Sequence, residues 1–168
     1  TTKYRIMMKR FFTIAVLMFS ALSFVSCNKE QTRLQIDDIP GRAEITGTLV
    51  INYGKALVGG KLVDRILPVA NTEVLVKLNN SSFMSGAYGT TDYRTMTNAE
   101  GEYSVKIPVP DSGVAVTVTV ADILGTYMDG SSEEVRGVFS FYRSVPGVKP
   151  GNIKIVSGEF EFEEEDEF

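Results

Sequence analysis

Residues 95–110, Thr95-Met-Thr-Asn-Ala-Glu-Gly-Glu-Tyr-Ser-Val-Lys-Ile-Pro-Val-Pro110, decide the fold of this chain. The segment from Asn98 to Gly101 supplies turn chemistry, and Gly101 is free to adopt a positive φ. After the turn, apolar and polar residues alternate up to Pro108. That period of two predicts a β-strand with one buried face, which ends at the prolines because proline cannot donate to a strand ladder. The stretch therefore predicts a β-hairpin that fixes the register of its neighbours.

Similar alternation on both sides of this hairpin predicts further strands, at residues 45–51, 74–78, 114–120, 135–142, 153–156 and 159–163. Val116 and Val118 are expected in the core. Gly59-Gly60 is a candidate turn of an extra hairpin within residues 53–67. Two other segments, 79–91 and 123–134, are predicted to be long loops. Together these patterns predict an all-β fold, a single antiparallel β-sandwich of about seven to nine strands.

The pattern Thr-x-Thr-Asn-x-x-Gly-x-Tyr-x-Val-x-Ile-Pro at 95–108 resembles the central signature of carboxypeptidase regulatory-like domains. These are small transthyretin-like β-sandwiches, related in shape to the B repeats of collagen adhesins. Residues 45–51 and 68–74 are similar to the strand and the Pro-Val-Ala-Asn turn that precede the signature in that family. The resemblance covers about residues 43–121. It implies a non-catalytic sandwich, because the carboxypeptidases that carry such domains have a separate catalytic domain with His ligands.

The N-terminal residues predict export from the cytoplasm. Met7 or Met8 is the expected start, and residues 1–6 are interpreted as spurious upstream sequence. A basic pair is followed by the apolar residues 11–22, too few for the ~20 that a membrane-spanning helix needs. Phe24-Val-Ser-Cys27 then resembles the lipobox of bacterial lipoproteins, in which the signal is cut before an acylated Cys. A plain secretory signal with an incidental Cys is the alternative.

This resemblance implies three segments. Residues 1–26 are a signal peptide with a signal helix, 27–42 a lipidated flexible tether, and 43–168 the regulatory-like sandwich with an acidic C-terminal tail. Several acyl chains on Cys27 would hold the protein stably on a membrane. We therefore expect a Gram-negative outer-membrane lipoprotein that is surface-exposed, and we leave open that it faces the periplasm.

Composition argues against several function classes. The chain has no His, and Cys27 is its single thiol. A Ser-His-Asp triad and a His-ligated zinc site are therefore excluded. Residues 27–168 hold 13 of the 17 basic residues and all 21 acidic ones, a net charge of −8, which argues against a nucleic-acid partner. We expect no enzyme activity, no cofactor and no metal site.

The expected function is contact with a partner through the sandwich loops. The candidate partner-binding residues are Tyr88, Tyr93, Tyr127 and Met128, because Tyr and Met suit adaptable contact surfaces. The partner is expected to be another envelope protein, a host protein or a glycan. Two alternatives stay open. The first is a glycan-binding accessory lipoprotein of an outer-membrane uptake system, and the second is a pilus-type anchor subunit completed by a partner's strand.

Overall fold

The computed structural model describes residues 35–130 and 133–165. Apart from a helical turn at 35–37 and the short 3-10 helix η1 (Asn80–Ser82), their regular secondary structure is all β-strand. The expected all-β class is confirmed. No helix in the described part is long and apolar enough to cross a membrane. In chain order, the strands are β1 (Arg42–Val58), β2 (Lys61–Pro68), β3 (Glu73–Asn79), β4 (Thr90–Met96), β5 (Glu102–Pro108), β6 (Val114–Met128), β7 (Glu134–Val148), β8 (Ile153–Ile155), β9 (Gly158–Glu159) and β10 (Glu161–Glu164).

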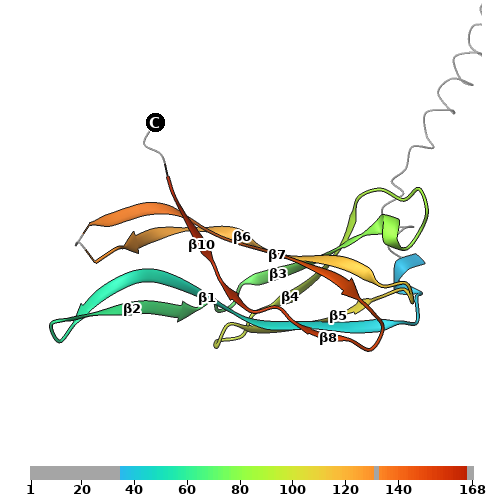
Figure 1. Cartoon of the computed structure of the whole chain (residues 1–168), viewed down its shortest axis with the longest axis horizontal. Coiled ribbons are helices and arrows are strands. Elements are labelled where there is room, and N and C mark those ends of the chain that lie inside the picture. The colour runs from blue at the N-terminus through green and yellow to red at the C-terminus, as the bar shows by residue number, and fades with distance from the viewer. Residues whose placement is uncertain (1–34, 131–132, 166–168) are drawn as a thin grey trace, which may run out of the picture. The chain divides into compact units, whose positions relative to one another are not determined.

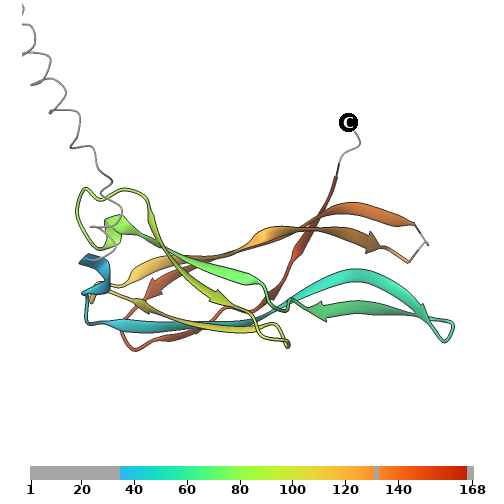
Figure 2. The same ribbon diagram turned by 180° about the vertical axis from the view of Figure 1, so that it is seen from behind.

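The strands form two facing layers. In one layer, β1 pairs with β5 on one side and with β8 on the other. In the second layer, β3 lies between β4 and β6, and β6 pairs with β7. Figures 1 and 2 show the layers from opposite sides. The sandwich is not purely antiparallel, because β8 and β9 both run parallel to β1. It also has more strands than expected, since the C-terminal segment is divided among three short ones.

The core lies between the layers and follows the alternation in the sequence. In the first ten residues of β1, every second side chain is buried. Strand β6 shows the same period, and Val116 and Val118 are buried as predicted. Apolar residues at every second position of these strands turn toward the opposite layer, so their burial removes apolar surface from water and holds the layers together.

The stretch at 95–110 forms the predicted turn but not the predicted hairpin. Asn98 Oδ1 accepts hydrogen bonds from the amides of Glu100 at 3.0 Å and Glu102 at 2.8 Å, and Gly101 has a φ of 76°. However, β4 pairs with β3, and β5 pairs with β1. The turn therefore carries the chain from one layer to the other. Alternation identified the buried face of β5, but a period of two does not specify which strand supplies the hydrogen bonds.

Backbone hydrogen bonds join the three motifs that carry the family resemblance. The Leu49 amide donates to the Gly101 carbonyl, and the Val69 amide donates to the Leu49 carbonyl, both at 2.9 Å. The Asn71 amide donates to the Thr97 carbonyl at 3.1 Å. A Cβ on Gly101 would lie 2.4 Å from the Leu49 carbonyl oxygen. Glycine is thus required here both by its positive φ and by this close approach.

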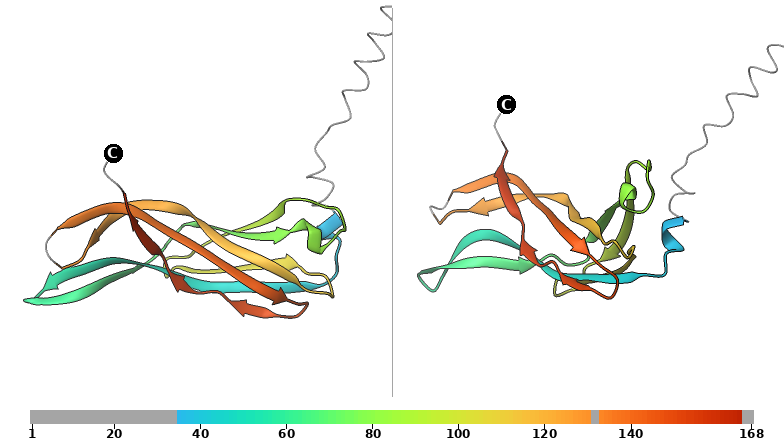
Figure 3. Two further views of the ribbon diagram at one scale, coloured as in Figure 1. Left: turned by 45° about the horizontal axis from the view of Figure 1, so that its top comes forward. Right: turned by 45° about the vertical axis from the view of Figure 1, so that its right-hand side comes forward.

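Two long hairpins leave the sandwich in the same direction (Figure 3). The first joins β1 and β2 through Gly59 and Gly60, whose φ values are 58° and 81°, which confirms the predicted hairpin turn. The second joins β6 and β7, so the prediction of a long loop at 123–134 was wrong. Gly125, within that segment, lies in β6. A Cβ there would be 3.0 Å from the Phe139 ring, so the strand uses glycine to admit that ring.

The C-terminal part of the predicted tether packs onto the domain. Ile36 is fully buried, and the Arg42 guanidinium donates to the Asp37 carbonyl at 2.9 Å. Residues 35–42 thus differ from the expected flexible tether, because an apolar side chain anchors them. Cys27 and the predicted signal peptide lie outside the described residues. At the other end, Glu163 and Glu164 belong to β10, so the expected acidic tail begins as a paired strand.

Candidate functional site

The predicted contact residues Tyr88 and Tyr93 lie near η1. Tyr88 is 92% exposed, in the loop between η1 and β4. Tyr93 packs partly against the core, and its hydroxyl donates to the Asp37 carboxylate. The two tyrosines therefore differ in kind, since Tyr88 is free to meet a partner while Tyr93 also holds the N-terminal segment.

Tyr127 and Met128 are the last two residues of β6, next to the turn of the second hairpin, which extends from the opposite end of the sandwich (Figure 1). The Tyr127 ring stacks on Phe162 at 5.2 Å, with an interplanar angle of 23°. Met128 is aligned with Gly54 of β1 in a parallel bridge. The structure therefore does not bring the four predicted residues together into one site, and Tyr127 contributes to packing within its hairpin.

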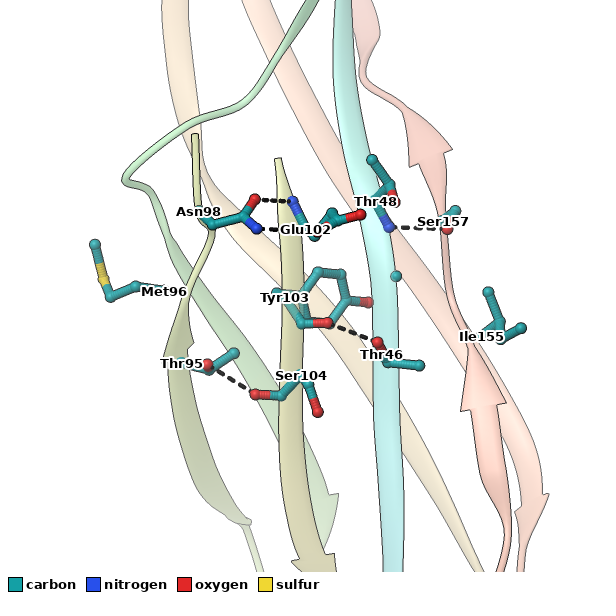
Figure 4. Close-up of a pocket in the computed structure, with 11 residues that line it drawn as sticks. Thr46, Thr48, Thr95, Met96, Asn98, Glu102, Tyr103, Ser104, Ile155 and Ser157 are labelled. Carbon is teal, nitrogen blue, oxygen red and sulfur yellow. Dashed lines mark hydrogen bonds between the residues drawn. The ribbon is translucent and has the colours of Figure 1, made fainter. Parts of the chain in front are cut away.

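An open depression of about 580 Å³ lies on the outer face of β5, β1 and β8 (Figure 4). Its polar groups bond to each other. Thr46 Oγ1 donates to the Tyr103 carbonyl at 2.8 Å, and Thr95 Oγ1 donates to the Ser104 carbonyl at 2.9 Å. Ser157 Oγ accepts from the Thr48 amide at 2.8 Å. These hydroxyls serve the backbone, so the depression offers a ligand few unengaged donors.

The depression also lacks an aromatic surface on which a sugar could stack. Tyr103 lines it, but this side chain is buried and its hydroxyl donates to the Val156 carbonyl at 2.7 Å. Burial raises the pKa of Tyr103 above its usual value, because desolvation disfavours the phenolate. Tyr103 is therefore a neutral structural residue that ties β5 to the segment between β8 and β9.

The first hairpin carries a surface that the sequence analysis did not identify. We define the apolar hairpin as residues 55–67. Half of the large apolar side chains that are strongly exposed in the described part of the chain lie on it, at positions Leu57, Val58, Leu62, Val63, Ile66 and Leu67. Leu57, which is 71% exposed, lies directly opposite Leu62, and Ala56 lies opposite Val63. Large exposed apolar side chains gathered on one element indicate a candidate interaction site.

The sequence contained a signal for this surface. Residues 56–58, 62–63 and 66–67 are apolar in consecutive positions instead of every second one. Because neighbouring residues of a strand point to opposite faces, such runs make both faces of a hairpin apolar. A strand between two layers would bury both faces, but all of β2 is exposed. The tip of the apolar hairpin lies close to the end of the β6–β7 hairpin, since a Cβ on Gly130 would lie 3.2 Å from Leu62 Cδ1.

Charged groups form no reactive cluster in the described part of the chain. Among residues 35–130 and 133–165, no three His, Cys, Asp or Glu side chains gather as they would around a metal ion. The ion pair of Arg94 with Glu73 spans 3.1 Å and that of Arg143 with Glu161 spans 3.0 Å, and both are exposed. Exposed pairs of this kind contribute little to stability.

Comparisons with known proteins assign no family. No family model and no curated protein matches the chain. Among solved structures, the shaft pilin SpaA from Lactobacillus rhamnosus GG is similar with a TM-score of 0.39 and 9% identity over 71% of this chain. Its D295N mutant gives a TM-score of 0.35 and 10% identity. The chain spans about half of the pilin's length, at 49%. At these TM-scores and identities the likeness does not assign a function, and the regulatory-like family remains a prediction.

Proposed function

We propose that this protein is a non-catalytic, lipid-anchored envelope protein that acts as an interaction or structural module. The apolar hairpin is the observation that carries the proposal. Its exposed side chains stand on a strand pair that extends from the sandwich, where a partner has access to them. Covering them would remove apolar surface from water at ~25 cal/mol per Å², and this gain favours association.

A binding role accounts for the described surface better than catalysis does. General acid–base chemistry at neutral pH most often uses His, which the chain lacks, or a carboxyl group whose pKa is raised by burial. The polar groups of the depression bond to each other, and its tyrosine is buried. These observations support contact through the apolar hairpin, with Tyr88 as a second exposed contact at the other end.

Capture of partners tests the proposed role. Leu57→Ser and Leu62→Ser should weaken capture of partners from the native envelope, while thermal melting stays unchanged. Tyr88→Ala should have a smaller effect, and Leu124→Ser, an exposed apolar residue of β6, is the matched control. Capture that is indifferent to every hairpin change would contradict the proposal. Turnover of a glycan, peptide or ester by the purified protein would also contradict it.

Acylation of Cys27 is the second part of the proposal, and it places the protein on the outer membrane, exposed at the cell surface. It rests on the apolar stretch at 11–22 followed by Phe24-Val-Ser-Cys27. In a Gram-negative host, the wild type should incorporate labelled palmitate and sediment with membranes. Cys27→Ala should do neither. A wild type that stays soluble and unlabelled would refute the anchor without affecting the binding role.

The two alternatives differ in their support. A glycan-binding accessory role has no exposed aromatic platform in the depression to support it. A subunit that pairs strands with a partner is favoured by the open edge of β2, whose residues are all exposed. An edge of this kind presents unpaired N–H and C=O groups to an added strand.

A further inference from the structure

Two open strand edges lie at the ends of the path β10-β7-β6-β1-β2. Within the described residues, β2 pairs only with β1, and β10 pairs only with β7. From this geometry we infer that the partner is a second copy of this chain, in which β10 adds to β2 of the first copy. The inference rests on the proposed binding role and identifies the partner of the apolar hairpin.

The charges on the two edges are complementary. Strand β2 carries Lys61 and Arg65 against a single acid, Asp64, although the whole chain has a net charge of −4. The charged residues of β10 and of the position after it are all acidic, at positions 161, 163, 164 and 165. A basic edge and an acidic edge attract each other, so charge favours β10 of a second copy as the strand that covers β2.

The strand directions permit such a pairing. Three neighbouring pairs along the path are antiparallel: β10 with β7, β7 with β6, and β1 with β2. Strands β6 and β1 are parallel where Met128 pairs with Gly54. Strands β2 and β10 of one copy therefore run in opposite directions along the path. A second copy in the same orientation places its β10 antiparallel to β2 of the first. Antiparallel pairing is the more stable kind of ladder.

The side chains offer a matching register. If Val63 lies opposite Phe162 of the next copy, then Lys61 lies opposite Glu164, which gives an apolar pair beside an ion pair. Opposite pairs of either kind stabilise antiparallel sheets. This register also sets Asp64 opposite Glu161, a like-charged pair that counts against it, and Arg143, 3.0 Å from Glu161, offsets part of this repulsion.

Charge disfavours the registers in which β2 would pair with β2 of another copy over most of its length. In an antiparallel pair centred on Asp64, two Asp64 side chains would lie opposite each other, and centring on Arg65 would oppose two arginines. Centring on Val63 would oppose Lys61 and Arg65. Like charges directly opposite destabilise a sheet, and natural edge strands use charges in this way to prevent wrong pairing. In these registers the charges of β2 thus favour an acidic strand over a second β2.

The inferred contact is heterologous, because it joins different surfaces of the two copies. Each added copy leaves one free β2 edge and one free β10 edge. Contacts of this type produce a ring if the rotation between copies closes, and an open filament if it does not. The inference therefore predicts oligomers larger than dimers.

Disulfide crosslinking of the full chain in cells tests the contact. Leu62 and Glu163 lie opposite each other in the proposed register, at a spacing that a disulfide can bridge. After mild oxidation, the double variant Leu62→Cys/Glu163→Cys should give a ladder of dimers, trimers and larger species. Wild type, which retains Cys27, and each single variant are the controls and should give no ladder. A double variant without a ladder would overturn the inference.

Charge reversal tests the specificity of the contact. In the crosslinking background, Lys61→Glu/Arg65→Glu should lower the crosslinked fraction about tenfold, which corresponds to ~1.4 kcal/mol. Glu164→Lys/Glu165→Lys should lower it similarly. Cells that produce both reversed chains should recover the ladder, because the β2 edge of each matches the β10 edge of the other. Recovery also shows that the variants fold, and a ladder unaffected by reversal would overturn the inference.

The outcomes separate this inference from the proposed function. Suppose that no ladder forms, yet Leu57→Ser and Leu62→Ser abolish capture of a different envelope protein. The binding role then stands, and the inference that the partner is a second copy is wrong. If the protein sediments with vesicles of 70% phosphatidylcholine and 30% phosphatidylglycerol through the same leucines and forms no ladder, the apolar hairpin binds lipid instead. If the wild type captures no partner and the double cysteine variant forms no ladder, both the binding role and the second copy are refuted.

Discussion

The two hairpins that extend from the sandwich have similar lengths but different surroundings. The β6–β7 hairpin is joined by a third strand, β10, whose Phe162 packs 4.9 Å from the Phe139 ring and 5.2 Å from Tyr127. The β1–β2 hairpin receives no third strand along β2 within the described residues, and its leucines and valines stay exposed. Both hairpins are therefore apolar, but within the described residues only the β6–β7 hairpin has a third strand along its edge.

This difference separates a hairpin that adds buried aromatic contacts to the fold from one that leaves apolar side chains exposed. Tyr53, Phe139 and Phe162 form an aromatic cluster at the base of the hairpins, with 5.1 Å between the first two ring centroids. Aromatic contacts of this kind add to the stability that burial supplies. The apolar hairpin contributes little comparable burial, so its side chains remain available for a partner. A single chain thus carries a completed hairpin and an incomplete one.

The largest expected effect comes from breaking the completed hairpin. Phe139 is fully buried and contacts both Tyr53 and Phe162. Phe139→Ala should lower the free energy of unfolding by ~3–5 kcal/mol, because it removes buried surface and leaves a cavity. Urea unfolding measures the change. Leu124→Ala, on the exposed face of the same hairpin, is the control and should change stability by no more than ~0.5 kcal/mol. Equal effects would contradict the difference in burial.

A smaller, pH-dependent effect on the free energy of unfolding is expected from Tyr103, in β5 of the sandwich. Tyr103→Phe should cost ~1–3 kcal/mol at pH 7, because the Val156 carbonyl loses its donor in a buried place. Burial raises the pKa of Tyr103 in the folded state, so wild-type stability should fall as pH rises above ~10, where the unfolded chain ionises first.

Tyr103→Phe lacks this ionisation, so the difference in unfolding free energy between it and wild type should narrow from pH 7 to pH 11. Urea unfolding at several pH values measures the difference. Tyr88→Phe is the control, since that side chain is 92% exposed and should change neither value. Parallel stability curves for wild type and Tyr103→Phe would mean that the Tyr103 hydroxyl is not buried as described.

The smallest effect on stability is expected in the incomplete hairpin. Leu57→Ser and Leu62→Ser should each change the free energy of unfolding by no more than ~0.5 kcal/mol, because both side chains are exposed. Thermal melting checks this, alongside Phe139→Ala as the destabilised reference. A loss of several kcal/mol would show that these leucines are packed within the chain, and the apolar hairpin would then not be a contact surface.

Much of the fold was predictable because local patterns have local causes. The alternation at 45–51 and 114–120 indicated strands with one buried face, and Val116 and Val118 are buried accordingly. Gly59 and Gly60 specified a hairpin turn through their positive φ values. Phe160 is buried and Phe162 packs on the core between exposed glutamates, as a period of two requires. In each case the conformation depends on the residue and its nearest neighbours in the chain.

The candidate contact surface was less predictable, because exposure depends on distant elements. The four residues chosen as contacts share a composition, but the structure separates Tyr88 and Tyr93 from Tyr127 and Met128. The consecutive apolar residues of β2 were compatible with a strand buried on both faces. Only the arrangement of the other strands, which leaves β2 at an edge, shows that these residues are exposed.

The sequence by itself determined the β-strand class, the turns at 59–60 and 98–101, and the buried face of most strands, because side-chain alternation and positive φ are properties of short segments. Tertiary structure alone decided which strands pair. It placed β4 and β5 in different layers and extended β6 to Met128. It also packed Phe162 against the β6–β7 hairpin, while the β1–β2 hairpin has no third strand along β2 within the described residues. Backbone hydrogen bonds are the same for every residue type, so the choice of partner depends on how all the strands pack at once.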